Sequence, residues 1–277
     1  MPAWKEGRVP RVDHQQLTEH FESALTGEPR PLHSFLREHS NLPGPRGNLE
    51  LAGQFAELVA TRAAGDRGAA IWEVVAGLAA VGPEEAPVGD PGEFVAFCGT
   101  VAAAGFAADA SRRPGVWQTV RRAAEDPRWR LWEAAAQAVQ RALALERREA
   151  LAVLEGWAAR GGWLLLRAVA AGVADPPLLA DPALAAAALG LHEVVCGRFV
   201  GATDRRDPDF RVLRQGLGFT LSVVVAAAPG PGFTLLRRLA AAGDRDLAWV
   251  LRSNLGKGRL ARSHPEEVEG VGRLLAG

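Results

Sequence analysis

A tryptophan-rich segment at residues 126–133 holds the residue types best suited to ligand chemistry. Trp129 and Trp132 stand three residues apart, so on a helix they share one face, and Glu133 follows directly. Exposed indole rings can stack on bases or hold a peptide, although packing between helices is the commoner role of tryptophan. Trp132 is therefore a candidate partner-binding residue, and Glu133 is the one carboxylate considered for catalysis.

A second candidate is the loop Pro43-Gly44-Pro45-Arg46-Gly47-Asn48, which precedes a predicted helix. Its glycines permit close backbone approach, and Asn48 with the free amides of the helix start can hold an anion that Arg46 also contacts. The segment lacks the Gly-Lys-Ser/Thr ending of a phosphate-binding P-loop. The competing interpretation is a plain turn between two helices.

A third candidate lies near the C-terminus, where four positive charges occur without an acid between residues 252 and 262. A basic strip that follows an aromatic residue can contact phosphate groups. The competing interpretation is a solvated helix end whose cations offset the helix dipole. The candidate binding residues are Trp249, Arg252, Lys257, Arg259 and Arg262.

The sequence favours a non-enzymatic protein, with the question of activity left open. The histidines form no HExxH pattern, and the chain has no Gly-x-Ser-x-Gly elbow. Cys98 and Cys196 lie far apart without zinc-ligand spacing, so both are expected to be buried free thiols. We therefore expect no metal site and no cofactor.

Composition limits the partners that the chain can have. The 277 residues include 32 basic and 32 acidic side chains, so the net charge is zero and a nucleic-acid partner would need a local basic patch. The first residues lack the apolar core of a signal peptide, and the longest apolar stretch, near residues 221–228, is shorter than a membrane span. We expect a cytoplasmic protein with no membrane contact.

Apolar residues at helical spacing, interrupted by Pro and Gly, predict an all-α chain without strands. We read residues 1–277 as one helical domain, with irregular helices over 1–110 and helical repeats over 110–277. The predicted helices span 13–25, 31–38, 49–63, 71–81, 93–105, 114–125, 127–145, 147–159, 163–173, 182–199, 208–227, 232–242, 247–259 and 265–275.

One phrase recurs at the starts of these helices. Asp126-Pro127-Arg128-Trp129-Arg130 returns 81 residues later at 207–211, and in a weaker form after a further 37 residues at 244–248. These spacings are close to two periods and one period of a helical repeat of about 40 residues. Asp accepts hydrogen bonds from first-turn amides and Pro fits the first helical position, so the phrase predicts a capped helix start.

The Asp-Pro-x-apolar-Arg phrase resembles the signature of HEAT repeats. That resemblance implies an α-solenoid of stacked antiparallel helix pairs, in which the second helix of each pair lines the concave side and Asp and Arg form a ladder between repeats. It predicts that Arg130 and Arg211 are structural and pair with an Asp of their own or an adjacent repeat. The resemblance weakens at Ala248, which replaces Arg, and at Gly161-Gly162, which replace Asp-Pro.

Two functions follow from this resemblance. The first is a binding or scaffold protein that engages a macromolecule, most plausibly another protein, through its concave face. The alternative is a DNA-binding protein or DNA glycosylase similar to the HEAT-repeat alkylation-repair class, which places aromatic residues and a carboxylate on a basic groove. The Trp-x-x-x-Asp phrase of that class is missing, so Glu133 is only a stand-in. Arginine and tryptophan gathered around an acid on the concave face would favour the alternative.

Overall fold

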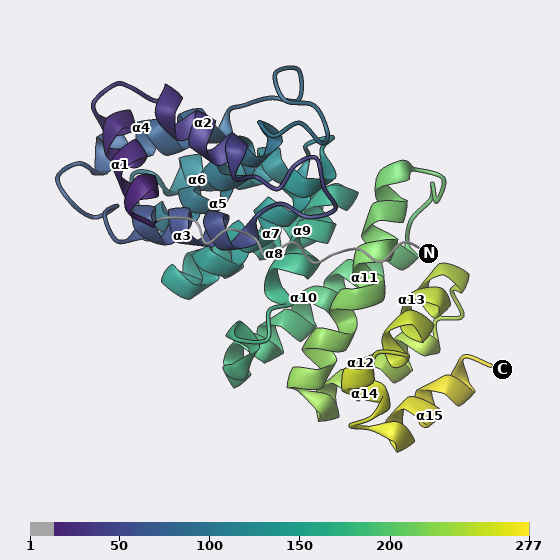
Figure 1. The fold of residues 1–277 in the computed structure, drawn as a ribbon. Coiled ribbons are helices and arrows are strands. Elements are labelled where there is room, and N and C mark those ends of the chain that lie inside the picture. The colour runs from purple at the N-terminus through teal and green to yellow at the C-terminus, as the bar shows by residue number, and fades with distance from the viewer. Residues whose placement is uncertain (1–13, 277) are drawn as a thin grey trace.

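The computed structural model describes residues 14–276, and every regular element in that part of the chain is helical (Figure 1). The all-α prediction is thereby confirmed. The helices are α1 (His14–Leu25), α2 (Arg30–Glu38), α3 (Leu49–Ala60), α4 (Gly68–Ala79), α5 (Glu93–Ala103), α6 (Arg113–Ala124), α7 (Trp129–Leu145), α8 (Arg147–Arg160), α9 (Trp163–Val173), α10 (Pro182–Val200), α11 (Pro208–Ala227), α12 (Pro229–Ala240), α13 (Arg245–Leu255), α14 (Gly258–Ala261) and α15 (Pro265–Leu274), with short 3-10 helices η1 (Ala104–Phe106) and η2 (Leu178–Ala180).

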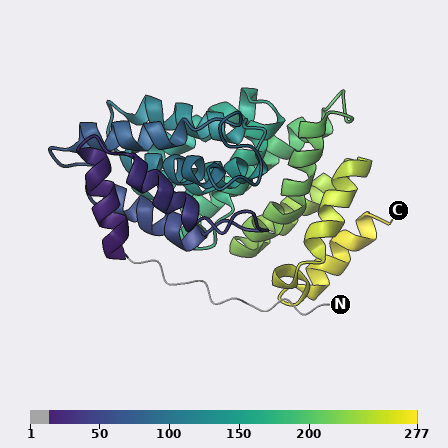
Figure 2. The same cartoon turned by 45° about the horizontal axis from the view of Figure 1, so that its top comes forward.

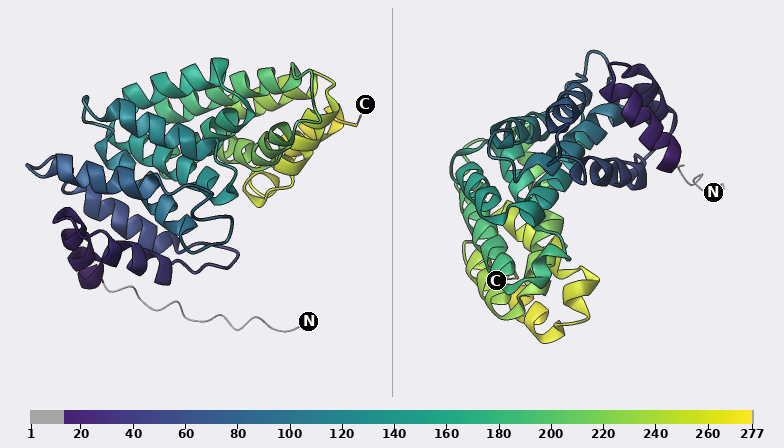
Figure 3. Two further views of the ribbon diagram at one scale, coloured as in Figure 1. Left: turned by 90° about the horizontal axis from the view of Figure 1, so that it is seen from above. Right: turned by 90° about the vertical axis from the view of Figure 1, so that its left-hand side faces the viewer.

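Alternate helices pack against one another in sequence order. Helices α3, α5, α7, α9, α11 and α13 each contact the next in this series, and we call the series the odd row. Helices α4, α6, α8, α10 and α12 lie against one side of it, each in contact with a neighbouring odd-row helix. Figures 2 and 3 show the helices side by side and the whole stack bending along its length. The other side of the row, which the loop before α3 and the short helix α14 cover in part, we call the open side.

The recurring Asp phrases all open helices of the odd row. The Asp207 side chain accepts a hydrogen bond from the amide of Asp209, and the Asp244 side chain accepts one from the amide of Leu247, so both cap their helices as predicted. Asp126 differs, because α7 begins only at Trp129 and has no side-chain cap. The predicted cap at Asp13 lies outside the described residues.

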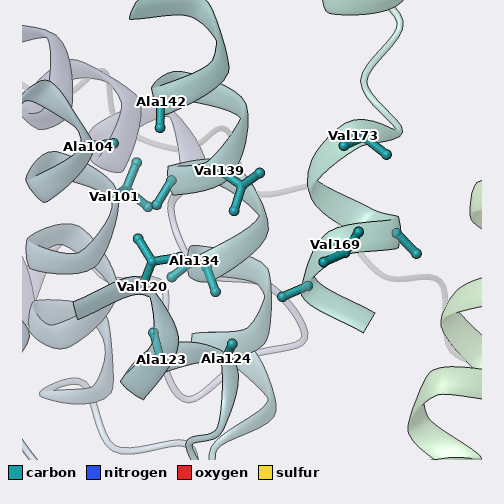
Figure 4. Packing of buried hydrophobic residues seen from close by; sticks show 14 of the residues in the cluster. Val101, Ala104, Val120, Ala123, Ala124, Ala134, Val139, Ala142, Val169 and Val173 are labelled. Atoms are coloured by element: carbon teal, nitrogen blue, oxygen red, sulfur yellow. The ribbon is translucent and has the colours of Figure 1, made fainter. Parts of the chain in front are cut away.

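Small residues let the odd-row helices approach closely. Alanines and valines fill the space between α5, α6, α7 and α9 (Figure 4). A Cβ atom at Gly172 of α9 would lie 2.4 Å from a methyl carbon of Val139 on α7, so only glycine permits this approach. The spacing of α7 and α9, which bounds the site described below, therefore depends on a glycine.

Helices α10 and α11 have the length and hydropathy of membrane-spanning segments. About half of each apolar window, 50% and 56%, is buried inside the protein, as is usual for core helices of globular proteins. Two helices of this length and hydropathy are therefore only weak evidence for a membrane-spanning protein. Cys98 and Cys196 are buried free thiols as expected, and burial raises the pKa of each.

His192 on α10 makes stability depend on pH. It is fully buried, with Nδ1 2.9 Å from the carbonyl oxygen of Ala188 and Nε2 3.0 Å from the hydroxyl of Thr220 on α11. Burial lowers its pKa from 6.5 to about 4. The unfolded chain therefore takes up this proton below pH 6.5, and the folded protein does so only near pH 4. Acidification across that window should remove about 3 kcal/mol of unfolding free energy.

Urea unfolding at several pH values measures this loss. Because carboxylates also titrate at acid pH, the matched comparison is with His192→Gln, whose pH profile should be flatter by the same amount. Identical slopes for the two proteins between pH 6.5 and 4 would contradict the assignment.

Candidate functional site

The open side of the odd row contains a pocket of about 470 Å³ between α7, α9 and the loop that precedes α3. Three arginines from three different segments line it, namely Arg46 of the loop, Arg130 of α7 and Arg167 of α9. Trp129 and Glu133, one turn apart on α7, also line it, as do Phe97 of α5 and the amide side chains of Gln137 and Gln140. We call this the α7/α9 pocket.

Arg130 is held rigidly at the wall of this pocket. Its side chain is only 9% exposed, and its Nη1 donates to Oε2 of Glu93 at 3.1 Å. Its Nη2 donates to the carbonyl of Gly44, which ties α7 to the loop that carries Arg46. Its Nε has no hydrogen-bond partner within the described part of the chain. Because this Nε is itself buried, Arg130 acts on an anionic ligand in the pocket through its positive charge and not through a free donor.

The predicted pairing of Arg130 with an Asp is wrong. Its partner is Glu93, which begins α5 and is fully buried. Asp126 pairs instead with Arg128, two residues earlier than expected. Arg211 is exposed and makes none of the ion pairs found within residues 14–276, so its predicted structural pairing is absent.

Arg46 of the loop before α3 lines the pocket, but Asn48 of the same loop does not. The Asn48 side chain is buried, where its Oδ1 accepts from the amide of Leu51 at 3.2 Å and its Nδ2 donates to the carbonyl of His39 at 3.0 Å. Both ends of the amide are thus used to cap α3 and close the loop. Asn48 is therefore structural, whereas the exposed Arg46 remains available to a ligand.

The two tryptophans of α7 have different positions. Trp129 lines the pocket, and the Arg130 guanidinium lies 4.3 Å from its ring centroid. Trp132, the residue favoured by the sequence, is half-buried and donates its indole N–H to the carbonyl of Asp126. Glu133 is exposed at the pocket. The aromatic residue placed to meet a ligand beside Glu133 is therefore Trp129.

Arg167 is a pocket residue that the sequence analysis missed. Its Nη1 donates to the carbonyl of Trp132 at 3.1 Å, and its guanidinium lies 5.5 Å from the Trp132 ring centroid. Burial lowers its pKa, and the nearby Glu133 opposes that effect. A signal was present, because Arg167 is the only charged residue between Trp163 and Val173. A single charge on an otherwise apolar helix often marks a site.

The basic stretch near the C-terminus is divided by a helix break. The predicted helix 247–259 ends at Leu255, and Lys257 precedes the short helix α14. Lys257 Nζ and the Arg259 guanidinium lie 5.6 and 4.8 Å from the ring centroid of Phe219 on α11. We call Phe219, Lys257 and Arg259 the Phe219 platform.

The remaining predicted binding residues lie apart from that platform. Arg252 is exposed and donates to the carbonyl of Leu275 at 2.7 Å, and Arg262 is exposed after α14. Trp249 on α13 is 39% exposed, and the guanidinium of Arg214 lies 4.2 Å from its ring centroid. The structure thus pairs exposed aromatic rings with cations on α11 and α13 and half-buried tryptophans with cations on α7, all in the odd row.

Within residues 14–276, His, Cys, Asp and Glu form no group of three that could hold a metal ion. Comparison with known protein families, curated proteins and solved structures finds no match to this chain. The function must therefore be argued from the site itself.

Proposed function

We propose that the chain is a nucleic-acid-binding α-solenoid whose open side follows the phosphate backbone. The observation that best supports this proposal is that Arg46, Arg130 and Arg167 all line one pocket beside an aromatic ring. Glu133 is the only carboxylate lining that pocket among the described residues, so the lining is net positive in a protein whose total charge is zero. Guanidinium groups suit phosphate because their paired donors bind it in bidentate fashion.

The solenoid part of the proposal is supported by periodicity. The Asp phrases fall at equivalent places, the starts of α7, α11 and α13, so the sequence period matches one helix pair. Arg205, in the loop before α11, pairs with Asp244 at the start of α13 at 2.6 Å. This pair resembles one rung of the Asp–Arg ladder that links successive HEAT repeats.

The proposal predicts that the pocket arginines carry salt-dependent binding. The double variant Arg46→Ala/Arg167→Ala should weaken binding of labelled DNA, single-stranded or duplex, measured by fluorescence anisotropy. The log–log dependence of Kd on salt between about 50 and 200 mM should become shallower by about two, because each lost phosphate contact releases roughly one counterion fewer.

Arg148 provides a matched control, because it carries the same charge on α8 and its side chain is 90% exposed. Arg148→Ala should leave the salt slope unchanged. Equal effects of Arg148→Ala and the pocket variants would show only general attraction. Failure of the wild type to bind DNA at low salt would refute the nucleic-acid function and return the chain to the protein-scaffold hypothesis.

A second candidate function is base excision from alkylated DNA. It is favoured by Glu133, which stands one helical turn after Trp129 and places a carboxylate beside an aromatic ring at the same pocket. The test is release of bases from alkylated DNA by the wild type and by Glu133→Gln. Release that depends on Glu133 would support the enzyme. Binding without release would leave a non-catalytic nucleic-acid-binding protein.

A further inference from the structure

We propose that the Phe219 platform is a second contact for the same nucleic acid and accepts an unpaired base, so that the protein binds single strands more tightly than duplex. This inference rests on the nucleic-acid binding proposed above and specifies which kind of nucleic acid, single-stranded or duplex, the protein prefers. It is supported by the exposure of Phe219, by two cations without acidic partners among the described residues, and by the closeness of the platform to the α7/α9 pocket.

The platform is built as an exposed aromatic surface with positive charge beside it. Phe219 is 49% exposed, although phenylalanine is normally among the most buried residues. Lys257 and Arg259 lie against its ring and make no ion pair with any described carboxylate. A base can stack on such a ring while the adjacent cations meet the phosphates on either side of it.

An apolar hollow of about 510 Å³ extends from the platform. Leu179, Val223 and Ala226 line it, and in the described part of the chain Arg259 is its only charged lining residue. An unpaired base can pack against the apolar wall of this hollow. Arg259 lines the hollow and also lies over the Phe219 ring. Leu179, Val223 and Ala226 offer a flat base an apolar wall beside the cations.

The platform and the α7/α9 pocket lie close together on neighbouring helices. A Cβ atom at Gly216 of α11 would lie 3.3 Å from Cγ of Arg167, so this turn of α11 packs directly on a pocket arginine. Phe219 is three residues farther along, about 4.5 Å along the helix axis. One strand can therefore contact both places within a few nucleotides, the scale of a typical single-strand site.

The platform discriminates between strand types because duplex bases are already stacked and paired. A duplex can offer a base to Phe219 only by extruding it, which costs a few kcal/mol, whereas a single strand offers unpaired bases freely. The arginines of the α7/α9 pocket contact phosphate, which both kinds of strand present. The preference for single strands should therefore reside in Phe219.

The test uses the full chain and two labelled probes, an oligothymidine of about 16 nucleotides and a blunt duplex of the same length. Phe219→Leu keeps an apolar side chain but removes the stacking face. It should weaken single-strand binding about 5- to 150-fold, the range that stacking on one aromatic side chain provides, and leave duplex binding unchanged. Phe219→Trp should retain the preference, and Val194→Ala, an equally exposed apolar position on α10, should have no effect.

The outcomes separate this inference from the proposed function. If Arg46→Ala/Arg167→Ala weakens both probes but Phe219→Leu weakens neither, or both equally, the platform inference fails and nucleic-acid binding stands. A wild type that prefers duplex also overturns the inference. If neither probe binds, both proposals fail together.

Discussion

Arg128→Leu is expected to lower the free energy of unfolding by about 3–5 kcal/mol, because it leaves a nearly buried carboxylate without its counter-charge. The Arg128 side chain is 2% exposed, and its Nε and Nη2 each donate to the Asp126 carboxylate at 2.8 Å. The guanidinium also donates to the carbonyl oxygens of Ala86 and Val81 at 3.1 and 2.9 Å. Leucine fills part of the volume but satisfies none of these acceptors.

Urea unfolding measures the loss, with an unchanged m-value as evidence that the denatured state is the same. Arg121→Ala supplies the control on the preceding helix, since the Arg121–Glu125 pair is an exposed i,i+4 pair. Such pairs contribute roughly 0.3–0.5 kcal/mol, so this variant should unfold almost as the wild type does. A loss below about 1 kcal/mol for Arg128→Leu would mean that water replaces the missing donors.

The ends of some helices were predictable because their signals are local, whereas α4 and α12 each begin three residues before the predicted start. Both bounds of α9 and α11 agree with the sequence prediction. Gly162 and Asp207 are the N-cap residues of these helices, and both residue types favour that position. The break after Leu255 was missed although Gly256 and Gly258 mark it, because a glycine inside a helical pattern can also be tolerated.

The members of the site were predictable only in part, because a pocket depends on contacts between distant segments. Arg46 was recognised from its loop, but Asn48 could not be known to be used up by capping α3 and by the carbonyl of His39. Arg167 joins the pocket only because Gly172 lets α9 approach α7 closely. Nothing in the sequence of α7 or of α9 alone indicates how closely the two helices pack.

The shift of the Asp partner from Arg130 to Arg128 has the same origin. From the phrase alone, either arginine can reach Asp126. The choice is made by acceptors on a distant segment: the carbonyls of Val81 and Ala86, before α5, bind Arg128, and the buried Glu93, which begins α5, binds Arg130. A repeat signature therefore indicates a helix start more reliably than it indicates which ion pair forms there.

The buried pair of Glu93 and Arg130 gives the second large expected effect. Glu93→Leu leaves the guanidinium of Arg130 buried without a counter-charge, and should lower the free energy of unfolding by about 3–5 kcal/mol. The double variant Glu93→Leu/Arg130→Met removes both charges, and should recover most of that loss because an apolar pair of similar volume avoids the desolvation cost. A double-mutant cycle in urea measures the coupling between the two side chains.

The same cycle separates stability from function. The double variant should fold, yet it should bind DNA more weakly than the wild type, because it lacks one pocket guanidinium and the hydrogen bond from Arg130 to Gly44 that holds the Arg46 loop. A double variant as unstable as Glu93→Leu would show that the two side chains stabilise the fold by more than neutralising each other's charge. A stable double variant with wild-type DNA affinity would place the phosphate contacts on Arg46 and Arg167 alone. Binding would then require neither a phosphate contact by Arg130 nor its hydrogen bond to Gly44.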